Sequence, residues 1–208
     1  MAAGAATSVD DVFINCPFDP DYVQTFQALL FCVYACEFRP RSARELDDSG
    51  QLRMEKLYSL IEECRYGIHD LSRTELDKKH RLPRFNMPLE LGLFLGAKRY
   101  GSTAQKQKKV LIFDTEKFRY QKFISDLAGM DIHEHGGEPV KAVEETRDWL
   151  ANVSRRKLPS SAKIVRLYQQ FLSDLPAICG ELEFDPGEIP YVDYERIVVN
   201  WLLEAPAS

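Results

Sequence analysis

Short apolar runs alternate with helix-patterned segments along the first 150 residues, and this alternation restricts the possible folds most strongly. The strand-like runs span residues 11–15, 38–43, 66–72, 110–114 and 131–134. Apolar residues at helical spacing lie between or after them, at 22–33, 57–64, 87–97 and 140–152. Strands that alternate with such helices are joined by right-handed crossovers and pair in parallel. The sequence therefore predicts an α/β fold with a parallel sheet of about five strands and helices on both faces.

The alternation stops after Lys157. Two further segments, 162–175 and 191–203, have helical patterns and are joined by a link rich in proline and glycine. We therefore expect an α/β domain over residues 10–157 and a C-terminal helical extension over residues 158–208. The extension either packs on the sheet edge or forms a dimer contact.

The net charge and the cysteine content indicate which partners the protein binds and in which cellular compartment it resides. The net charge is −5, and basic residues form only short clusters such as 106–109, which suit solvated element ends better than a phosphate-binding patch. The five cysteines are odd in number and form no CxxC pair, which fits a reducing compartment. Residues 1–8 lack the features of a signal peptide, and no segment has the roughly 20 apolar residues of a spanning helix. We expect a cytoplasmic protein that binds neither membranes nor nucleic acid.

Glu90 is the only charged residue between Met87 and Ala97. A helix that is apolar nearly all round is normally buried, so this carboxylate must be paired, solvated by a cleft or strongly perturbed. We expect it in the first helical turn, beside Pro88, where the helix dipole favours the ionised form. An ionised carboxylate in a cleft suits a nucleophile or an oxocarbenium stabiliser. The alternative is a structural carboxylate, satisfied by backbone amides or by Arg84.

Polar side chains also stand at the predicted strand ends. Asn15 follows the first apolar run, Asp70 and Ser72 end the third, and Asp114 ends the fourth. Ligands of parallel α/β sheets bind outside the carboxyl ends of the strands, so these residues are candidates for a binding site. Asp70 fits a ribose-binding carboxylate, and it equally fits a cap for the following loop.

Other residues near these strand ends are weaker candidates for a functional role. Pro17-Phe18 fits either a clamp for a flat base or a simple turn, and Cys16 fits a packed thiol better than a nucleophile. His133 and His135 flank a glutamate but lack a third ligand in sequence, so we expect no metal site.

The order of these elements resembles TIR domains. Val12-Phe13-Ile14-Asn15 resembles their first-strand box, and Asp48-Ser49-Gly50 resembles their acidic-glycine turn. The segment 61–68 is similar to their second helix and third strand. The segment 86–92 is similar to the helix that carries the glutamate of TIR NADases, which falls on Glu90.

The same pieces resemble nucleoside 2-deoxyribosyltransferases, a related flavodoxin-like group. There Pro17-Phe18 matches a loop that lines the base, Asp70 matches a strand-end aspartate, and Glu90-Leu91-Gly92 matches the segment with the nucleophile. The resemblance covers about residues 10 to 150 and suggests a divergent bacterial branch. Where the transferases have Asp-Asp-Gly before this helix, the chain has Pro83-Arg84-Phe85-Asn86, without a second carboxylate.

The resemblance implies an N-glycosidase that acts on NAD or a related nucleotide, in bacterial immunity, antiviral defence or signalling. A nicotinamide leaving group needs little acid assistance, so one carboxylate suffices and NAD, as substrate and not as cofactor, is favoured over a nucleoside. Glu90 would be catalytic, and the substrate-binding residues would be Asn15, Pro17, Phe18, Asp70, Ser72, Arg84 and Asn86. The alternative is a non-catalytic module that senses a nucleotide or assembles through TIR-like contacts. We expect a nucleotide ligand, and either a homo-oligomer or a partner protein.

Overall fold

Five parallel strands form the sheet in the computed structural model, which describes residues 8–17, 19–45, 50–74, 76 and 85–205. The strands are β1 (Ser8–Asn15), β2 (Arg39–Arg41), β3 (Cys64–Asp70), β4 (Lys109–Asp114) and β5 (His133–Glu134). Their order in space is β2-β1-β3-β4-β5, and each neighbouring pair is parallel. This is the strand order of flavodoxin-like sheets, in which the winding direction reverses between β1 and β3. The predicted fold class is confirmed.

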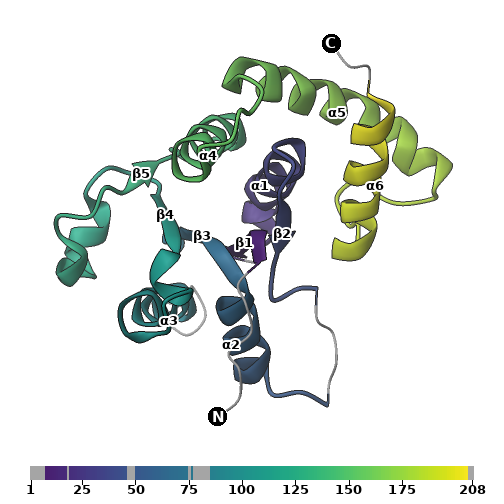
Figure 1. Ribbon diagram of the computed structural model, residues 1–208. Coiled ribbons are helices and arrows are strands. Elements are labelled where there is room, and N and C mark those ends of the chain that lie inside the picture. The colour runs from purple at the N-terminus through teal and green to yellow at the C-terminus, as the bar shows by residue number, and fades with distance from the viewer. Residues whose placement is uncertain (1–7, 18, 46–49, 75, 77–84, 206–208) are drawn as a thin grey trace.

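Helices cover both faces of this sheet (Figure 1). One layer contains α1 (Val23–Ala35) and α4 (Pro139–Ser154), and the other contains α2 (Arg53–Glu63) and α3 (Asn86–Tyr100). Side chains alternate between the faces of a strand, so β1 contributes to both layers. Val12 and Ile14 belong to the cluster with α1 and α4, while Phe13 belongs to the cluster with α2 and α3.

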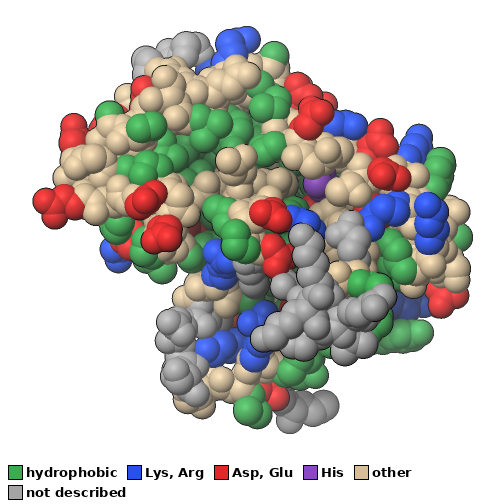
Figure 2. Space-filling view, turned by 180° about the vertical axis from the view of Figure 1, so that it is seen from behind, with side chains coloured by type: hydrophobic (Ala, Val, Ile, Leu, Met, Phe, Trp, Pro, Cys, Tyr) green, Lys and Arg blue, Asp and Glu red, His purple; other side chains and the backbone are tan. Residues whose placement is uncertain are grey.

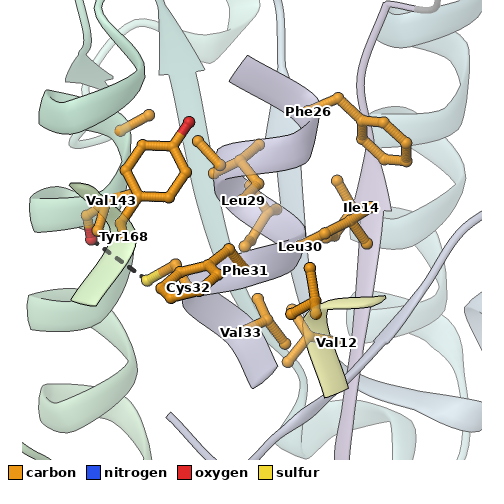
Figure 3. Close-up of a cluster of buried hydrophobic side chains, with 14 of the residues drawn as sticks. Val12, Ile14, Phe26, Leu29, Leu30, Phe31, Cys32, Val33, Val143 and Tyr168 are labelled. Atoms are coloured by element: carbon orange, nitrogen blue, oxygen red, sulfur yellow. Dashed lines mark hydrogen bonds between the residues drawn. The ribbon is translucent and has the colours of Figure 1, made fainter. Parts of the chain in front are cut away.

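The C-terminal helices α5 (Ser161–Glu181) and α6 (Tyr191–Glu204) form a further layer outside α1. The ring of Phe31 in α1 lies 5.4 Å from that of Tyr168, 5.1 Å from that of Phe171 and 5.9 Å from that of Trp201. Figure 3 shows Phe31 and Cys32 on the side of α1 toward Val143 and Tyr168. Leu30 and Val33 lie toward the strands. Helix α1 is therefore buried on two opposite sides, which explains its nearly continuous apolar sequence.

The extension thus shares its core with the α/β domain. It covers the helix layer, and the expected boundary after residue 157 falls in the link between α4 and α5. One hydrophobic cluster includes residues of β1, α1, α4, α5 and α6. Among the described residues, no helix combines the length and apolar character that crossing a membrane requires. All five cysteines are buried and unbridged.

No α-helix lies between β4 and β5 among the described residues. The connection contains two short 3₁₀ turns, η3 (Arg119–Lys122) and η4 (Ser125–Leu127). Tyr120, Leu127 and Ile132 of this connection pack with Ile112 of β4.

The buried side chain of Lys108 stabilises the packing of the α2 and α3 layer on the sheet. Lys108 Nζ donates to the backbone carbonyls of Ile61 and Cys64, where α2 passes directly into β3. The ammonium also lies 4.7 Å from the ring centroid of Phe94. Burial lowers the pKa of Lys108 to about 8. Removal of this side chain would therefore cost two buried hydrogen bonds to a charged donor.

Candidate functional site

Three neighbouring strands end in buried polar residues at one edge of the sheet. Asn15 ends β1, Asp70 ends β3 and Asp114 ends β4, and each is at most 2% exposed. Because the strands are parallel and adjacent, their carboxyl ends meet at this edge, where α/β sheets bind ligands. The sequence prediction that these residues gather at one edge is therefore confirmed by the strand order.

Glu90 lies in the second turn of α3. The helix begins at Asn86 with Phe85 as its N-cap, and its first turn contains no acidic residue. The prediction of a first-turn position was wrong, because Pro88 occupies the third helical position and not the first. The helix dipole falls off within the first turn, so it gives Glu90 little support for the ionised form.

Burial dominates the electrostatics of Glu90. The residue is 6% exposed, and burial raises the pKa of its carboxyl to about 7, although the positive charge of Arg53 acts in the opposite direction. Within the described part of the chain, no backbone amide or side chain donates a hydrogen bond to this carboxylate. Near neutral pH the carboxyl therefore exists in both protonation states, which suits a group that stabilises charge and exchanges a proton.

Asp70 is the centre of a hydrogen-bonded cluster on the α1 side of the sheet. Tyr22 Oη donates to Oδ2, His135 Nε2 donates to the same oxygen at 2.8 Å, and the Ser72 amide donates to Oδ1 at 2.7 Å. His135 Nδ1 accepts the N–H of Gly137 at 2.9 Å, which leaves its Nε2–H to point at Asp70. Burial acts to raise the pKa of Asp70, but these hydrogen bonds outweigh it and hold the pKa below its ordinary value. Asp70 is thus an ionised acceptor with three donors.

Asn15 ties the end of β1 to the first turn of α3. Its Nδ2 donates to the carbonyl of Met87 at 3.0 Å and lies 2.9 Å from Nδ1 of His69. Burial, together with the nearby charge of Lys108, lowers the pKa of His69 to about 3, so this imidazole is neutral. Its neutral Nδ1 can accept the second amide hydrogen of Asn15. These bonds fix the start of the helix that carries Glu90.

Phe94 of α3 packs closely against Gly67 of β3. A Cβ added at Gly67 would lie 2.7 Å from the Phe94 ring and 2.8 Å from Nε2 of His69. The bare backbone of Gly67 therefore allows α3 to approach the sheet.

Asp114 is held by an arginine from the following connection. Arg119 Nε donates to Asp114 Oδ1 at 2.7 Å, and Arg119 also donates to the carbonyl of Leu71 at 2.8 Å. Burial raises the pKa of Asp114, although Arg119 acts in the opposite direction. Arg119 therefore joins the carboxyl ends of β3 and β4.

Three buried polar atoms at this edge form no hydrogen bond within the described part of the chain. Asn15 Oδ1, Ser72 Oγ and Asp114 Oδ2 are buried, and none has a hydrogen-bond partner among the residues that the structure describes. Buried polar atoms are normally bonded, so these three, at the ends of neighbouring strands, can still accept or donate bonds.

The remaining predicted residues occupy different surroundings. Pro17 is buried after β1, and Asn86 is exposed at the first position of α3. Phe18, Arg84 and the Asp48-Ser49 turn lie outside the described residues.

Cys16 is a poor candidate for a nucleophile, and the two histidines considered as metal ligands bind carboxylates. Cys16 is buried, and burial together with the charges of Asp70 and Glu90 raises the pKa of its thiol well above the usual value, which disfavours a thiolate nucleophile. His133 lies 2.6 Å from a carboxylate oxygen of Glu145, and His135 binds Asp70. No cluster of three potential metal ligands occurs among the described residues.

Sequence reasoning missed Tyr22 and Arg119, and it considered His135 only as a metal ligand and not as a partner of Asp70. Each reaches a strand-end aspartate from a connecting segment. The one available signal was the pair of glycines after His135, which is consistent with a tight turn; both have positive φ, 62° at Gly136 and 80° at Gly137.

No family model, no curated protein and no solved structure matches this chain.

Proposed function

We propose that the protein is an N-glycosidase that cleaves NAD or a related nicotinamide nucleotide. The observation that carries this proposal is the buried carboxyl of Glu90 near the carboxyl edge of the sheet, with a pKa raised to about 7. A carboxylate in low-dielectric surroundings interacts strongly with a cation that develops beside it. The resemblance of 86–92 to the TIR glutamate helix supports the same residue.

The reaction needs one carboxylate. The bond between ribose C1′ and the nicotinamide nitrogen breaks, and its electron pair leaves with nicotinamide, which becomes neutral. Ionised Glu90 would stabilise the positive charge on the ribosyl oxocarbenium. A water oxygen then bonds to C1′ and loses a proton to Glu90, which passes it to solvent. Because the leaving group departs uncharged, no second carboxyl acid is required.

The other residues of the edge would bind and position the substrate. Asp70 is fully buried, and its oxygens already accept three hydrogen bonds, so we assign it the positioning of the edge. Ser72, whose amide donates to Asp70, belongs to the same buried cluster. The exposed side chain of Asn86, at the start of α3, is available to the phosphates, and Asn15 holds the start of this helix in place. Such a reaction would deplete NAD and so serve bacterial immunity or signalling.

The test is release of free base from NAD, NADP and nucleosides, measured by chromatography over a range of protein concentrations. We expect nicotinamide from NAD, and no release by Glu90→Gln. Glu55→Gln is the matched control, since Glu55 is an exposed carboxylate on α2. Equal release by the wild-type protein and Glu90→Gln would refute the assignment.

A second candidate function is a non-catalytic nucleotide-binding module. It is favoured by Asp70, which is 0% exposed and already accepts hydrogen bonds from Tyr22, His135 and Ser72 within the protein. A carboxylate held in this way has a structural role and does not contact a reacting substrate. Calorimetric titration with NAD distinguishes the two functions. Binding of NAD without any base release, unchanged in Glu90→Gln, would favour the module over the enzyme.

A further inference from the structure

A groove of about 830 Å³ lies beside α3 on the outer surface of β4. Its apolar lining consists of Leu95 from α3, Val110 and Ile112 from β4, and Met130 from the connection to β5. The groove exists because that connection has only short 3₁₀ turns, so no helix among the described residues covers this part of the sheet beside α3. Its floor is therefore part of a helix-packing surface.

Basic side chains surround this apolar floor. Lys98 and Arg99 come from the last turn of α3, and Lys106 follows in the next turn of chain. Asp131 is the one acidic residue in the lining. None of the three cations forms an ion pair with another described residue. Burial, and to a smaller extent the charge of the nearby Lys109, lower the pKa of Lys98.

The link between α5 and α6 is acidic, whereas the groove is basic. Four acidic residues lie within eight positions, at Glu181, Glu183, Asp185 and Glu188, and all are exposed. Leu182 stands among them with 51% of its surface exposed. No ion pair joins these carboxylates to another residue of the described chain. The link therefore presents one apolar side chain surrounded by unpaired negative charge.

These two surfaces lie at opposite ends of the molecule. Figure 1 shows α3, β4 and β5 on the left, and the link between α5 and α6 at the right edge. Figure 2, seen from behind, shows acidic side chains at the corresponding left edge. A link cannot reach the groove of its own chain across this span, but it can reach the groove of another molecule.

We propose that the acidic link of one molecule docks into the basic groove of a second copy of this chain. Leu182 would enter the apolar floor, and the surrounding carboxylates would pair with Lys98, Arg99 and Lys106. The two surfaces differ, so the contact is head-to-tail, and each bound molecule presents a fresh groove or link. Such contacts generate open chains of molecules, or rings where the rotation closes.

Charge-reversal variants test this contact by sedimentation velocity across a wide concentration series at low and high salt. The groove variant is Lys98→Glu with Lys106→Glu, and the link variant is Glu181→Lys with Glu183→Lys. For the wild-type protein we expect an average mass that rises with concentration beyond that of a dimer and falls with added salt. Each variant alone should associate at least about tenfold more weakly. Circular dichroism melting confirms that both variants remain folded.

Mixing the two variants provides the decisive control. The acidic groove of the groove variant can then bind the basic link of the link variant. The unaltered acidic link of the groove variant can bind the unaltered basic groove of the link variant. An equimolar mixture should therefore associate again. A wild-type protein that stays monomeric throughout the series would overturn the proposal. Variants that associate like the wild type, a mass that stops at a dimer, or a mixture that stays monomeric would also overturn it.

Discussion

The substitution Glu90→Gln should change how the stability of the protein depends on pH. The carboxyl of Glu90 titrates near 4.5 in the unfolded chain, whereas burial raises its pKa to about 7 in the folded protein. Between these values the folded state holds a proton that the unfolded state has lost. The stability that this proton provides is therefore present at low pH and is lost as pH rises through 7. From pH 5 to pH 8 the loss amounts to about 2.5 kcal/mol.

Urea denaturation of the wild-type protein and Glu90→Gln at a series of pH values measures this loss. Trp149 and Trp201 provide the fluorescence signal. All other titrations are common to the two proteins, so the difference in unfolding free energy isolates Glu90. We expect Glu90→Gln to gain about 2.5 kcal/mol relative to the wild type between pH 5 and pH 8. Glu55→Gln should follow the wild-type curve, and parallel curves for Glu90→Gln and wild type would refute a buried Glu90.

The same denaturation assay at constant pH tests three other features of the fold. Lys108→Met should lower the unfolding free energy by about 2–4 kcal/mol, because two buried carbonyls lose their donor. Gly67→Ala should cost about 1–3 kcal/mol, since its Cβ would meet a ring at 2.7 Å, whereas Gly92→Ala meets open space in α3 and should stabilise by about 0.5–1 kcal/mol. Equal stability of the two alanine variants would contradict the close packing. Tyr22→Phe removes a donor to ionised Asp70 and should cost about 1–2 kcal/mol at neutral pH, a cost that shrinks in acid as Asp70 is protonated; a cost that does not change with pH would argue against this bond.

The fold was predictable because its strands and helices carry strong periodic patterns. The predicted run at 110–114 and the helix start at Asn86 agree with β4 and α3 within one residue. β2 is shorter than predicted, because only Arg39–Arg41 pairs with β1. The helix patterns of the C-terminal extension also agree with α5 and α6, but the sequence suggested the sheet edge or a dimer contact, whereas these helices cover the outer side of α1.

The candidate site was less predictable because its bonds join residues far apart in the chain. Asp70 and Glu90 were visible as unusual charges, whereas Tyr22 and His135 became relevant only once α1 and α4 packed on the same face of the sheet. The turn position of Glu90 was missed because proline is compatible with several positions of the first turn.

The burial of α1 on two sides has a consequence for the order in which the protein forms during translation. Residues 23–35 leave the ribosome early, yet the residues that cover their outer side, in α5 and α6, are made more than a hundred residues later. Until then, Phe31 and its apolar neighbours have no native cover. The nascent chain therefore carries an exposed apolar helix through most of its synthesis, which makes it a substrate for chaperones that bind such segments. Completion of the core is a late event in which the C-terminal helices close over one of the earliest parts of the chain.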